Sequence, residues 1–372
     1  MRPDDHLAYE IYISYTNKMQ PSVHARLLEA LRTHGPDVDS PPFAVPASRY
    51  RDPQRFAREL AAFAAPRPVL ASSALAPGSS MPVDGVGTPA LVVRGADGVV
   101  RAFANSCRHR AMRLRDEPGA VKAFVCPYHG WTYDLAGALV HVPHAEAFVG
   151  CEHRDLRALP VAERHGLIWL GDDVEAYVGE LGADLDALDF AALVVHRSSR
   201  TVRACNWKLV VEAFLDGYHL RVLHRDSVYR FFIDAASRVE RIGPHMRAIS
   251  ARRPLRDAGP VDASSALSEL GTPSFVIFPA TIVICHPDAI SLIGLTPLAA
   301  ERTAVEHTLL VSYDDAEHAA KTWAMIEDGV IQREDLWACE QIQRSLDDEL
   351  LFGGLEHAVR WFHDSLDAVV GE

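Results

Sequence analysis

The sequence is poor in cysteine and in positive charge, and it contains no long apolar run. Six cysteines among 372 residues are too few for a disulfide scaffold, so we expect a reducing compartment. The 37 Lys and Arg against 50 Asp and Glu give a formal charge of −13, which argues against nucleic acid as a partner. The longest apolar stretch, at 275–285, is interrupted by Pro279 and cannot span a bilayer. Since Met1 to His6 contain no apolar signal segment, we expect a cytoplasmic protein with no membrane partner.

What the sequence does have is 18 histidines within an ordinary globular composition, 48% hydrophobic and 23% charged. A length of 372 residues predicts two domains. Period-two runs predict a small all-β domain over 44–172. Over 173–372, strands in succession followed by helices predict an antiparallel sheet covered by helices, so the fold class is α+β. Residues 1–43 are expected to form a helical segment that packs on this second domain.

Single elements can also be placed. Apolar residues three and four apart predict a helix over 23–31 and another over 207–219, for which Asn206 is a suitable N-cap. Two alternating runs around a Gly-Ala-Asp-Gly turn predict a hairpin at 90–103. Residues 251–272 are expected to form a loop. Further strands are predicted at 123–125, 166–170, 275–285, 289–295 and 303–312.

Two Cys-His pairs form the first candidate site. Cys107 and His109 are followed, after 16 intervening residues, by Cys126 and His129. Two thiolates and two imidazoles suit a 2Fe-2S cluster of the Rieske type, in which the cysteines hold one iron and the histidines the other. A structural zinc ion is the alternative, because zinc also accepts two Cys and two His. Zinc fingers usually pair Cys with Cys and His with His, whereas each segment here supplies one of each, which favours the cluster.

These segments resemble a known family, the oxygenase (α) components of the Rieske non-haem iron oxygenases, which include the aromatic ring-hydroxylating oxygenases. The resemblance implies that the cluster is held by all four residues named above, and that a second metal site lies downstream. One departure is Ala111, where the family commonly has glycine. It concerns only the local turn. The residues that carry the resemblance are Cys107-Arg108-His109-Arg110 and Cys126-Pro127-Tyr128-His129-Gly130-Trp131.

A second candidate site begins on the helix predicted at 207–219. Asp216 and His219 lie on a polar stripe of this helix, and His224 follows five residues later. On an ideal helix these histidines would point about 140° apart, so they can reach one metal only if the helix ends or widens, which Gly217 permits. Asp335 is a candidate for the carboxylate of a facial two-histidine, one-carboxylate iron site. We expect it in the first turn of a helix.

The resemblance extends to both of these segments. It implies that His219, His224 and Asp335 bind a mononuclear Fe(II), and that Asp216 links this iron to the Rieske cluster of a neighbouring subunit. Ala213 stands where many ring-dihydroxylating members have asparagine, which disfavours cis-dihydroxylation. The matching residues are Asn206-Trp207-Lys208, Glu212 to Asp216, His219 and His224, and then Glu334-Asp335 with Glu340 and Gln343.

Two other patterns compete with this interpretation. A di-iron carboxylate bundle is suggested by Asp216-x-x-His219 and a second copy at Asp315 and His318, but three strand-like runs separate the two copies. The segment 85–90 matches a dinucleotide pattern, yet a strand follows it instead of a helix.

The expected function is that of a terminal oxygenase component that hydroxylates or oxidatively demethylates a small organic, aromatic substrate with O2. Because no flavin or nicotinamide site is found, electrons are expected from a separate NAD(P)H-dependent reductase, directly or through a ferredoxin. If Asp216 bridges subunits as in the family, the assembly is a homotrimer. A ring cis-dihydroxylating dioxygenase and a Rieske electron carrier fused to a non-catalytic binding domain remain as alternatives.

An apolar pocket near the iron would suit an aromatic or alicyclic ligand. Arg221, Arg225 and Arg230 are candidates to pair with a substrate carboxylate, although solvated or ion-paired arginines are more common. Candidates for the pocket wall are Phe214, Leu220, Tyr229, Phe231, Phe232, Phe275, Phe278 and Trp337.

Overall fold

The structure is a computed structural model that describes residues 21–372 except 37, 39, 40, 152, 313 and 314. The chain divides into two compact units, of which the smaller comprises residues 66–174. The predicted start of the β domain at 44 is therefore wrong, because the described residues up to 65 belong to the larger unit. Residues 1–20 of the predicted N-terminal segment lie outside the described residues.

The smaller unit is built from short antiparallel strands in three sheets, ordered β10-β5-β4-β3-β6, β11-β12-β2 and β7-β8-β9. The predicted hairpin is confirmed as β4 and β5, with Leu91 opposite Phe103. Its turn contains Gly98 at a φ of 78°, a conformation that glycine adopts without strain. The elements are β2 Arg67–Ala71, η2 Ser72–Ala74, β3 Ser79–Val83, β4 Ala90–Arg94, β5 Val100–Ala104, β6 Gly119–Ala120, β7 Phe124–Val125, β8 Thr132–Tyr133, β9 Leu139–His141, η3 Ala145–Ala147, β10 Ala158–Leu159, β11 Val161–Arg164 and β12 Leu167–Leu170.

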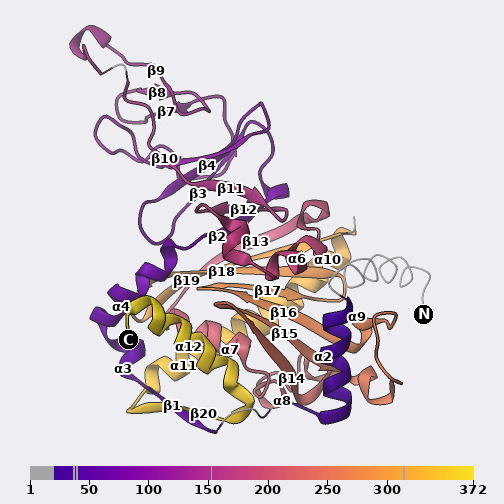
Figure 1. Cartoon of the computed structure of the whole chain (residues 1–372). Coiled ribbons are helices and arrows are strands. Elements are labelled where there is room, and N and C mark those ends of the chain that lie inside the picture. The colour runs from indigo at the N-terminus through magenta and orange to yellow at the C-terminus, as the bar shows by residue number, and fades with distance from the viewer. Residues whose placement is uncertain (1–20, 37, 39–40, 152, 313–314) are drawn as a thin grey trace. The chain divides into compact units, whose positions relative to one another are not determined.

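The larger unit contains a seven-stranded antiparallel sheet in the order β13-β19-β18-β17-β16-β15-β14 (Figure 1). The predicted antiparallel sheet with helices is thus confirmed. The strand predicted at 275–285 is instead two strands, joined where Phe278 and Pro279 share a cis peptide bond. The strands are β13 Val194–Arg203, β14 Phe232–Ile242, β15 His245–Arg252, β16 Gly271–Ile277, β17 Thr281–Cys285, β18 Ala289–Ala299 and β19 Arg302–Val311, with β1 Phe43–Pro46 and β20 Glu349–Phe352 as a separate pair.

Helices pack on this sheet through apolar faces. The predicted helix at 23–31 is confirmed within α2, where Leu27, Leu28 and Leu31 are buried and the helix contacts β14, β15 and α9. No helix among the described residues is long and apolar enough to cross a membrane. The helices are α2 Pro21–His34, α3 Ser48–Arg51, α4 Pro53–Glu59, η1 Leu60–Ala64, α5 Val174–Val178, α6 Leu181–Ala187, η4 Phe190–Ala192, α7 Trp207–Leu215, α8 Leu220–Leu223, η5 Tyr229–Phe231, η6 Arg253–Asp257, α9 Leu267–Leu270, α10 Ala316–Trp323, η7 Ala324–Asp335, α11 Leu336–Ser345, η8 Gly354–Glu356 and α12 His357–Val370.

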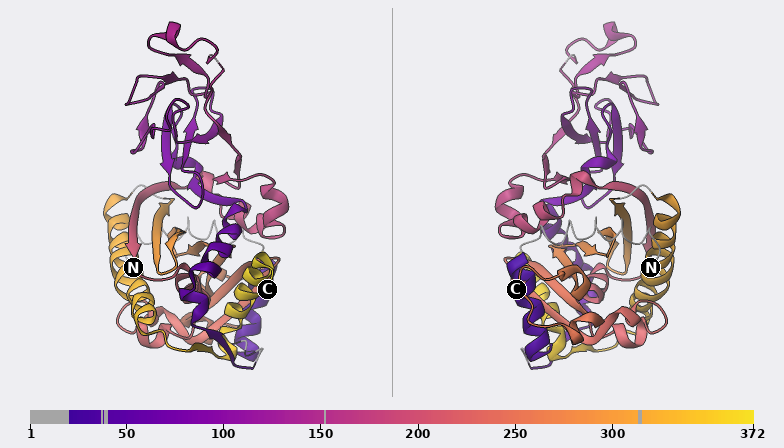
Figure 2. Two further views of the ribbon diagram at one scale, coloured as in Figure 1. Left: turned by 90° about the vertical axis from the view of Figure 1, so that its left-hand side faces the viewer. Right: turned by 90° about the vertical axis from the view of Figure 1, so that its right-hand side faces the viewer.

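One long helix runs through α10, η7 and α11, and its middle third, η7, is a π-helix. Figure 2 shows this helix, in orange and yellow, along one side of the larger unit. Glu327 of η7 connects this helix to the sheet. The Glu327 carboxylate accepts a hydrogen bond from Nδ1 of His307 on β19 at 2.8 Å and another from the hydroxyl of Ser199 on β13. π-helical turns are frequent at functional sites, and this one ends at Asp335.

Buried His245 makes the stability of this unit depend on pH. Its Nε2 donates to the Tyr177 carbonyl at 2.8 Å, and its Nδ1 accepts the Phe278 N–H at 3.1 Å. Burial lowers the pKa of His245 below its usual value, although the bond to Tyr177 acts in the opposite direction. Below about pH 6.5 the unfolded chain therefore binds a proton that the folded chain does not, so the free energy of unfolding falls as the pH falls.

We expect His245→Gln to reduce this acid destabilisation by about 1 kcal/mol between pH 6.5 and pH 5.5. Glutamine retains one donor and one acceptor but does not titrate. Urea unfolding of the iron-free protein and of the variant across this pH range measures the effect. Equal slopes for the two proteins would show that His245 is not the titrating group.

Candidate metal centres

Two loops of the smaller unit carry the Cys-His pairs, and their backbones match. In the first, the N–H of Cys107 donates to the Met112 carbonyl at 2.8 Å, and the N–H of Ala111 donates to the Cys107 carbonyl at 3.0 Å. In the second loop, the N–H of Gly130 donates to the Cys126 carbonyl at 3.0 Å, which corresponds to the bond from Ala111 to Cys107. Ala111 and Gly130 both have positive φ, 57° and 73°. The turn that glycine usually makes is thus kept at Ala111, at a cost of about 1 kcal/mol in backbone strain.

The four predicted cluster residues come together as a thiol pair and an imidazole pair. The Cys107 and Cys126 thiols are both buried and interact with each other. Burial raises the pKa of the Cys107 thiol, although the hydroxyl of Tyr133, 3.3 Å from its Sγ, opposes this. The rings of His109 and His129 lie 4.7 Å apart. The buried Nδ1 of His109 has no hydrogen-bond partner among the described residues, as expected of an atom that binds a metal.

This arrangement of the four residues favours a 2Fe-2S cluster over a single zinc ion. Four ligands of one zinc ion surround a single point, with neighbouring ligand atoms about 3.5 Å apart. In the part of the chain that the structure describes, the only trio of Cys, His, Asp or Glu whose ligand atoms converge in this way lies elsewhere, in the larger unit. A thiol pair beside an imidazole pair fits two irons.

The second set of residues depends on a break after α7. Asn206 caps α7 as predicted, with its side chain accepting the N–H of Lys208 at 3.0 Å. The helix ends at Leu215, and α8 begins at Leu220 with His219 and His224 at its two ends. The predicted interruption is therefore confirmed, and it turns both imidazoles toward the same point.

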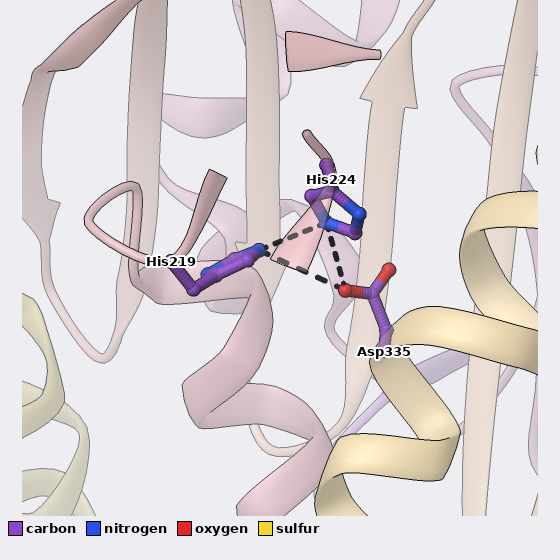
Figure 3. A group of neighbouring side chains, drawn as sticks. All are labelled: His219, His224 and Asp335. Carbon is purple, nitrogen blue, oxygen red and sulfur yellow. Dashed lines mark hydrogen bonds and ion pairs between the residues drawn. The ribbon is translucent and has the colours of Figure 1, made fainter. Parts of the chain in front are cut away.

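His219, His224 and Asp335 point toward one another (Figure 3). Nε2 of His219 lies 3.0 Å from Nε2 of His224, which lies 3.0 Å from Oδ1 of Asp335. The third distance, from Nε2 of His219 to Oδ1 of Asp335, is 3.7 Å. Ligand atoms about 2.1 Å from one metal, at right angles, are about 3 Å apart. Asp335 Oδ1 is buried and accepts no hydrogen bond from any described residue, so the trio fits a metal ion.

Two carboxylates contact the Nδ1 atoms of His219 and His224. Nδ1 of His224 lies 2.7 Å from Oε2 of Glu334, and Nδ1 of His219 lies 3.2 Å from Oδ2 of Asp216. Such contacts place the proton on Nδ1 and leave the lone pair of Nε2 available to bind a metal ion. Burial lowers the pKa of His224, but Asp335 and Glu334 outweigh it and raise the pKa in the metal-free protein.

Asp335 does not lie at the start of a helix. It is the last residue of η7, and α11 continues from Leu336 without a break. The expected interaction with a helix N-terminus is therefore wrong, because an uninterrupted helix has no free N–H groups there. The π-helical turn sets the position of this carboxylate instead.

The buried partners of Glu212 were not foreseen from the sequence. Glu212 is buried and accepts hydrogen bonds from the Tyr50 hydroxyl at 2.8 Å and from Nε2 of His363 at 2.9 Å.

Asp315 of the competing di-iron pattern caps α10, and His318 contacts Asp288, so the second Asp-x-x-His copy does not join the trio.

A cavity of about 370 Å³ opens beside the trio. Phe214, Leu220, Phe231 and Phe232 line it as predicted, whereas the other four predicted wall residues do not. The three predicted arginines are also absent from its wall. Arg252 lines it instead.

Two family models match the chain. Residues 65–161 match the Rieske [2Fe-2S] domain, and residues 190–372 match the catalytic domain of the ring hydroxylating alpha subunit. The chain belongs to the Rieske non-haem iron oxygenases. The cofactors of this family are a Rieske 2Fe-2S cluster and a mononuclear iron.

Relatives in this family differ in the reactions that their names state. The chain is 42% identical to the chlorobenzene dioxygenase subunit alpha of Cupriavidus sp. (strain PS12) over 145 residues, 35% of this chain and 32% of that protein. It thus spans about a third of that relative. It is 26% identical to the chloroplastic choline monooxygenase of Beta vulgaris over 308 residues, 74% of this chain and 66% of that protein.

Solved structures share the fold. A quaternary ammonium Rieske monooxygenase has a TM-score of 0.78 at 22% identity, covering 92% of this chain and 98% of that chain. Naphthalene 1,2-dioxygenase from Rhodococcus sp. has a TM-score of 0.72 at 20% identity, covering 93% of this chain and 97% of that one.

Proposed function

We propose that this chain is a terminal oxygenase component that hydroxylates or oxidatively demethylates a small organic substrate, using O2 and electrons from a separate reductase. The observation that carries the proposal is the trio of His219, His224 and Asp335 at the wall of a cavity. A binding domain without oxygen chemistry has no need of such a trio, which disfavours an electron carrier fused to a binding module.

Each group of residues has a separate task. Cys107, His109, Cys126 and His129 would hold the Rieske cluster, which stores one electron. The trio would hold Fe(II) by three ligands, which leaves open positions for O2 next to the substrate. Glu334 and Asp216 fix the orientation of the two imidazoles.

The outcome of the reaction is proposed from two observations. Ala213 lines the cavity where many ring-dihydroxylating members have asparagine, and the relative that aligns over 74% of this chain is named a monooxygenase. Both support hydroxylation or demethylation. The dioxygenase names of the relatives with higher identity keep cis-dihydroxylation as the alternative.

Electrons are proposed to come from an NAD(P)H-dependent reductase, directly or through a ferredoxin, in a homotrimer in which Asp216 connects neighbouring subunits. With a formal charge of −13 on this chain, the docking donor should present basic residues. None of the six cysteines, all of which the structure describes, forms a disulfide, which supports a cytoplasmic protein.

Metal analysis tests the proposal. We expect about three irons per chain, two in the cluster and one held by the trio, together with the visible absorption of a Rieske cluster. Asp335→Ala should lower the content to about two irons and leave the absorption unchanged. Asp288→Ala is the matched control, because Asp288 also lines the cavity but contacts His318, and it should keep three irons. One zinc per chain and no cluster absorption would contradict the proposal.

A further inference from the structure

Arg252 places a positive charge inside the cavity. It is the last residue of β15, and it lines the cavity together with Ala248 and Ser250, which lie on the same face of the strand because side chains alternate. Its guanidinium lies 5.7 Å from the centre of the Phe231 ring. Its backbone pairs with Phe232 of β14, but its guanidinium makes no ion pair or hydrogen bond with any residue that the structure describes.

The other charged groups at the cavity wall have partners. Asp335 and Asp216 face the metal-binding imidazoles, and Asp288 contacts His318. His286 is neutral, because burial, with smaller contributions from His307 and Arg252, lowers its pKa to about 3. An arginine remains charged at all physiological pH values. The charge of Arg252 is therefore left for a ligand to neutralise.

Hydroxyl groups lie beside Arg252 on the same face of the sheet. Ser237, Ser250 and Thr272 are paired across β14, β15 and β16 and all line the cavity. The Ser237 and Ser250 hydroxyls contact each other at 2.9 Å. Oγ1 of Thr272 has no hydrogen-bond partner among the described residues, although the residue is only 8% exposed. A buried hydroxyl without a partner is costly unless a ligand or water fills the space.

The remaining wall is apolar. Phe214 comes from α7, Phe231 from η5, and Ile326 and Val330 from η7. A ligand that fills the cavity must therefore present one anionic, hydrogen-bonding end to the sheet and a hydrophobic body to the helices.

We propose that Arg252 binds the carboxylate of an aromatic or alicyclic acid, which is the substrate class of this oxygenase. A planar guanidinium accepts a carboxylate through two parallel hydrogen bonds, and the hydroxyls of Ser250 and Thr272 can donate to the same oxygens. Arg221 and Arg225 are unsuited to this role, because they pair with Asp234 and Asp226. The inference rests on the proposed function and specifies its substrate.

Calorimetric binding of matched acid and amide probes to the full-length, iron-loaded protein tests the inference without turnover. The probes are benzoate with benzamide and 1-naphthoate with 1-naphthamide. The wild-type protein should bind each acid at least about tenfold more tightly than its amide. Arg252→Gln should abolish this preference while amide binding changes less than about threefold, and Arg252→Lys should recover part of it.

Arg221→Gln is the matched control, since it removes an exposed, ion-paired arginine from the same unit, and it should keep the wild-type preference. Equal binding of acids and amides, no binding of either acid, or an equal loss in Arg221→Gln would each overturn the role of Arg252. A preserved acid preference without product formation would instead refute the oxygenase function. Product formation from neutral aromatics without any acid preference would refute only the substrate class.

Discussion

Replacing Asp216 with asparagine should lower the rate of product formation about 10- to 100-fold while both metal centres stay filled. Oδ2 of Asp216 lies 3.2 Å from Nδ1 of His219, and Oδ1 accepts the N–H of Tyr218 at 2.5 Å. Asparagine keeps the shape and an acceptor oxygen but removes the charge. The side chain of Asp216 is 17% exposed, so part of its surface is accessible to a neighbouring subunit. Product analysis with a surrogate reductase, alongside iron analysis, measures the effect.

The step that the substitution slows distinguishes two roles of Asp216. Asp216 either transfers electrons between subunits or only orients His219. If it links the subunits, the pre-reduced cluster of the variant should remain reduced for longer in the presence of substrate and O2, which its absorption reports. Asp234→Asn is the matched control, because Asp234 is a nearby acid that pairs with exposed Arg221. Turnover at the full rate would exclude the link, and loss of the mononuclear iron would assign Asp216 a purely positioning role.

Local patterns and the family resemblance identified the candidate ligands, because these residues lie in short segments. The break between α7 and α8 was expected on the condition that His219 and His224 reach one metal, because on an ideal helix they would point about 140° apart. The partners of Glu212 could not be predicted this way, since Tyr50 and His363 are 162 and 151 residues away along the chain. Arg252 was missed for a similar reason: only the pairing of β15 with its neighbours decides which arginine faces the cavity.

The strands that line the cavity were also the hardest to predict. β14 and β15 are central to the site, yet their sequences show no clear apolar alternation. The reason is that their cavity face mixes polar residues, Ser237, Ser250 and Arg252, with apolar ones such as Val239 and Ala248. β17, β18 and β19 were predicted because they are largely buried and therefore strongly apolar. The polar residues on the cavity face of β14 and β15 thus weaken the alternation of apolar and polar residues on which strand prediction depends.

Replacing Lys208 with methionine should lower the free energy of unfolding by about 3 kcal/mol or more. Nζ of Lys208 lies 2.6 Å from Oε2 of Glu59, and both side chains are 0% exposed. Burial lowers the pKa of Lys208, and Glu59 partly offsets this. Without the ammonium group, Glu59 keeps only Arg55 as a buried partner, at 2.8 Å. Lys208 lies in the first turn of α7 and Glu59 ends α4, so the pair fixes the helix that leads to Asp216 and His219.

A double-mutant cycle separates this ion pair from the packing of the lysine stem. Because the cost of the single change arises from a buried carboxylate that has lost one of its two cationic partners, Lys208→Met with Glu59→Gln should recover about 1 to 3 kcal/mol relative to Lys208→Met alone. Lys321→Met is the matched control: Lys321 also contacts a glutamate, Glu317, but the two side chains are 72% and 81% exposed, so the change should cost less than about 0.5 kcal/mol. If the double variant is less stable than Lys208→Met, then Glu59 is stabilised mainly by Arg55, and Lys208 contributes through its hydrophobic stem against Tyr50 and Trp207.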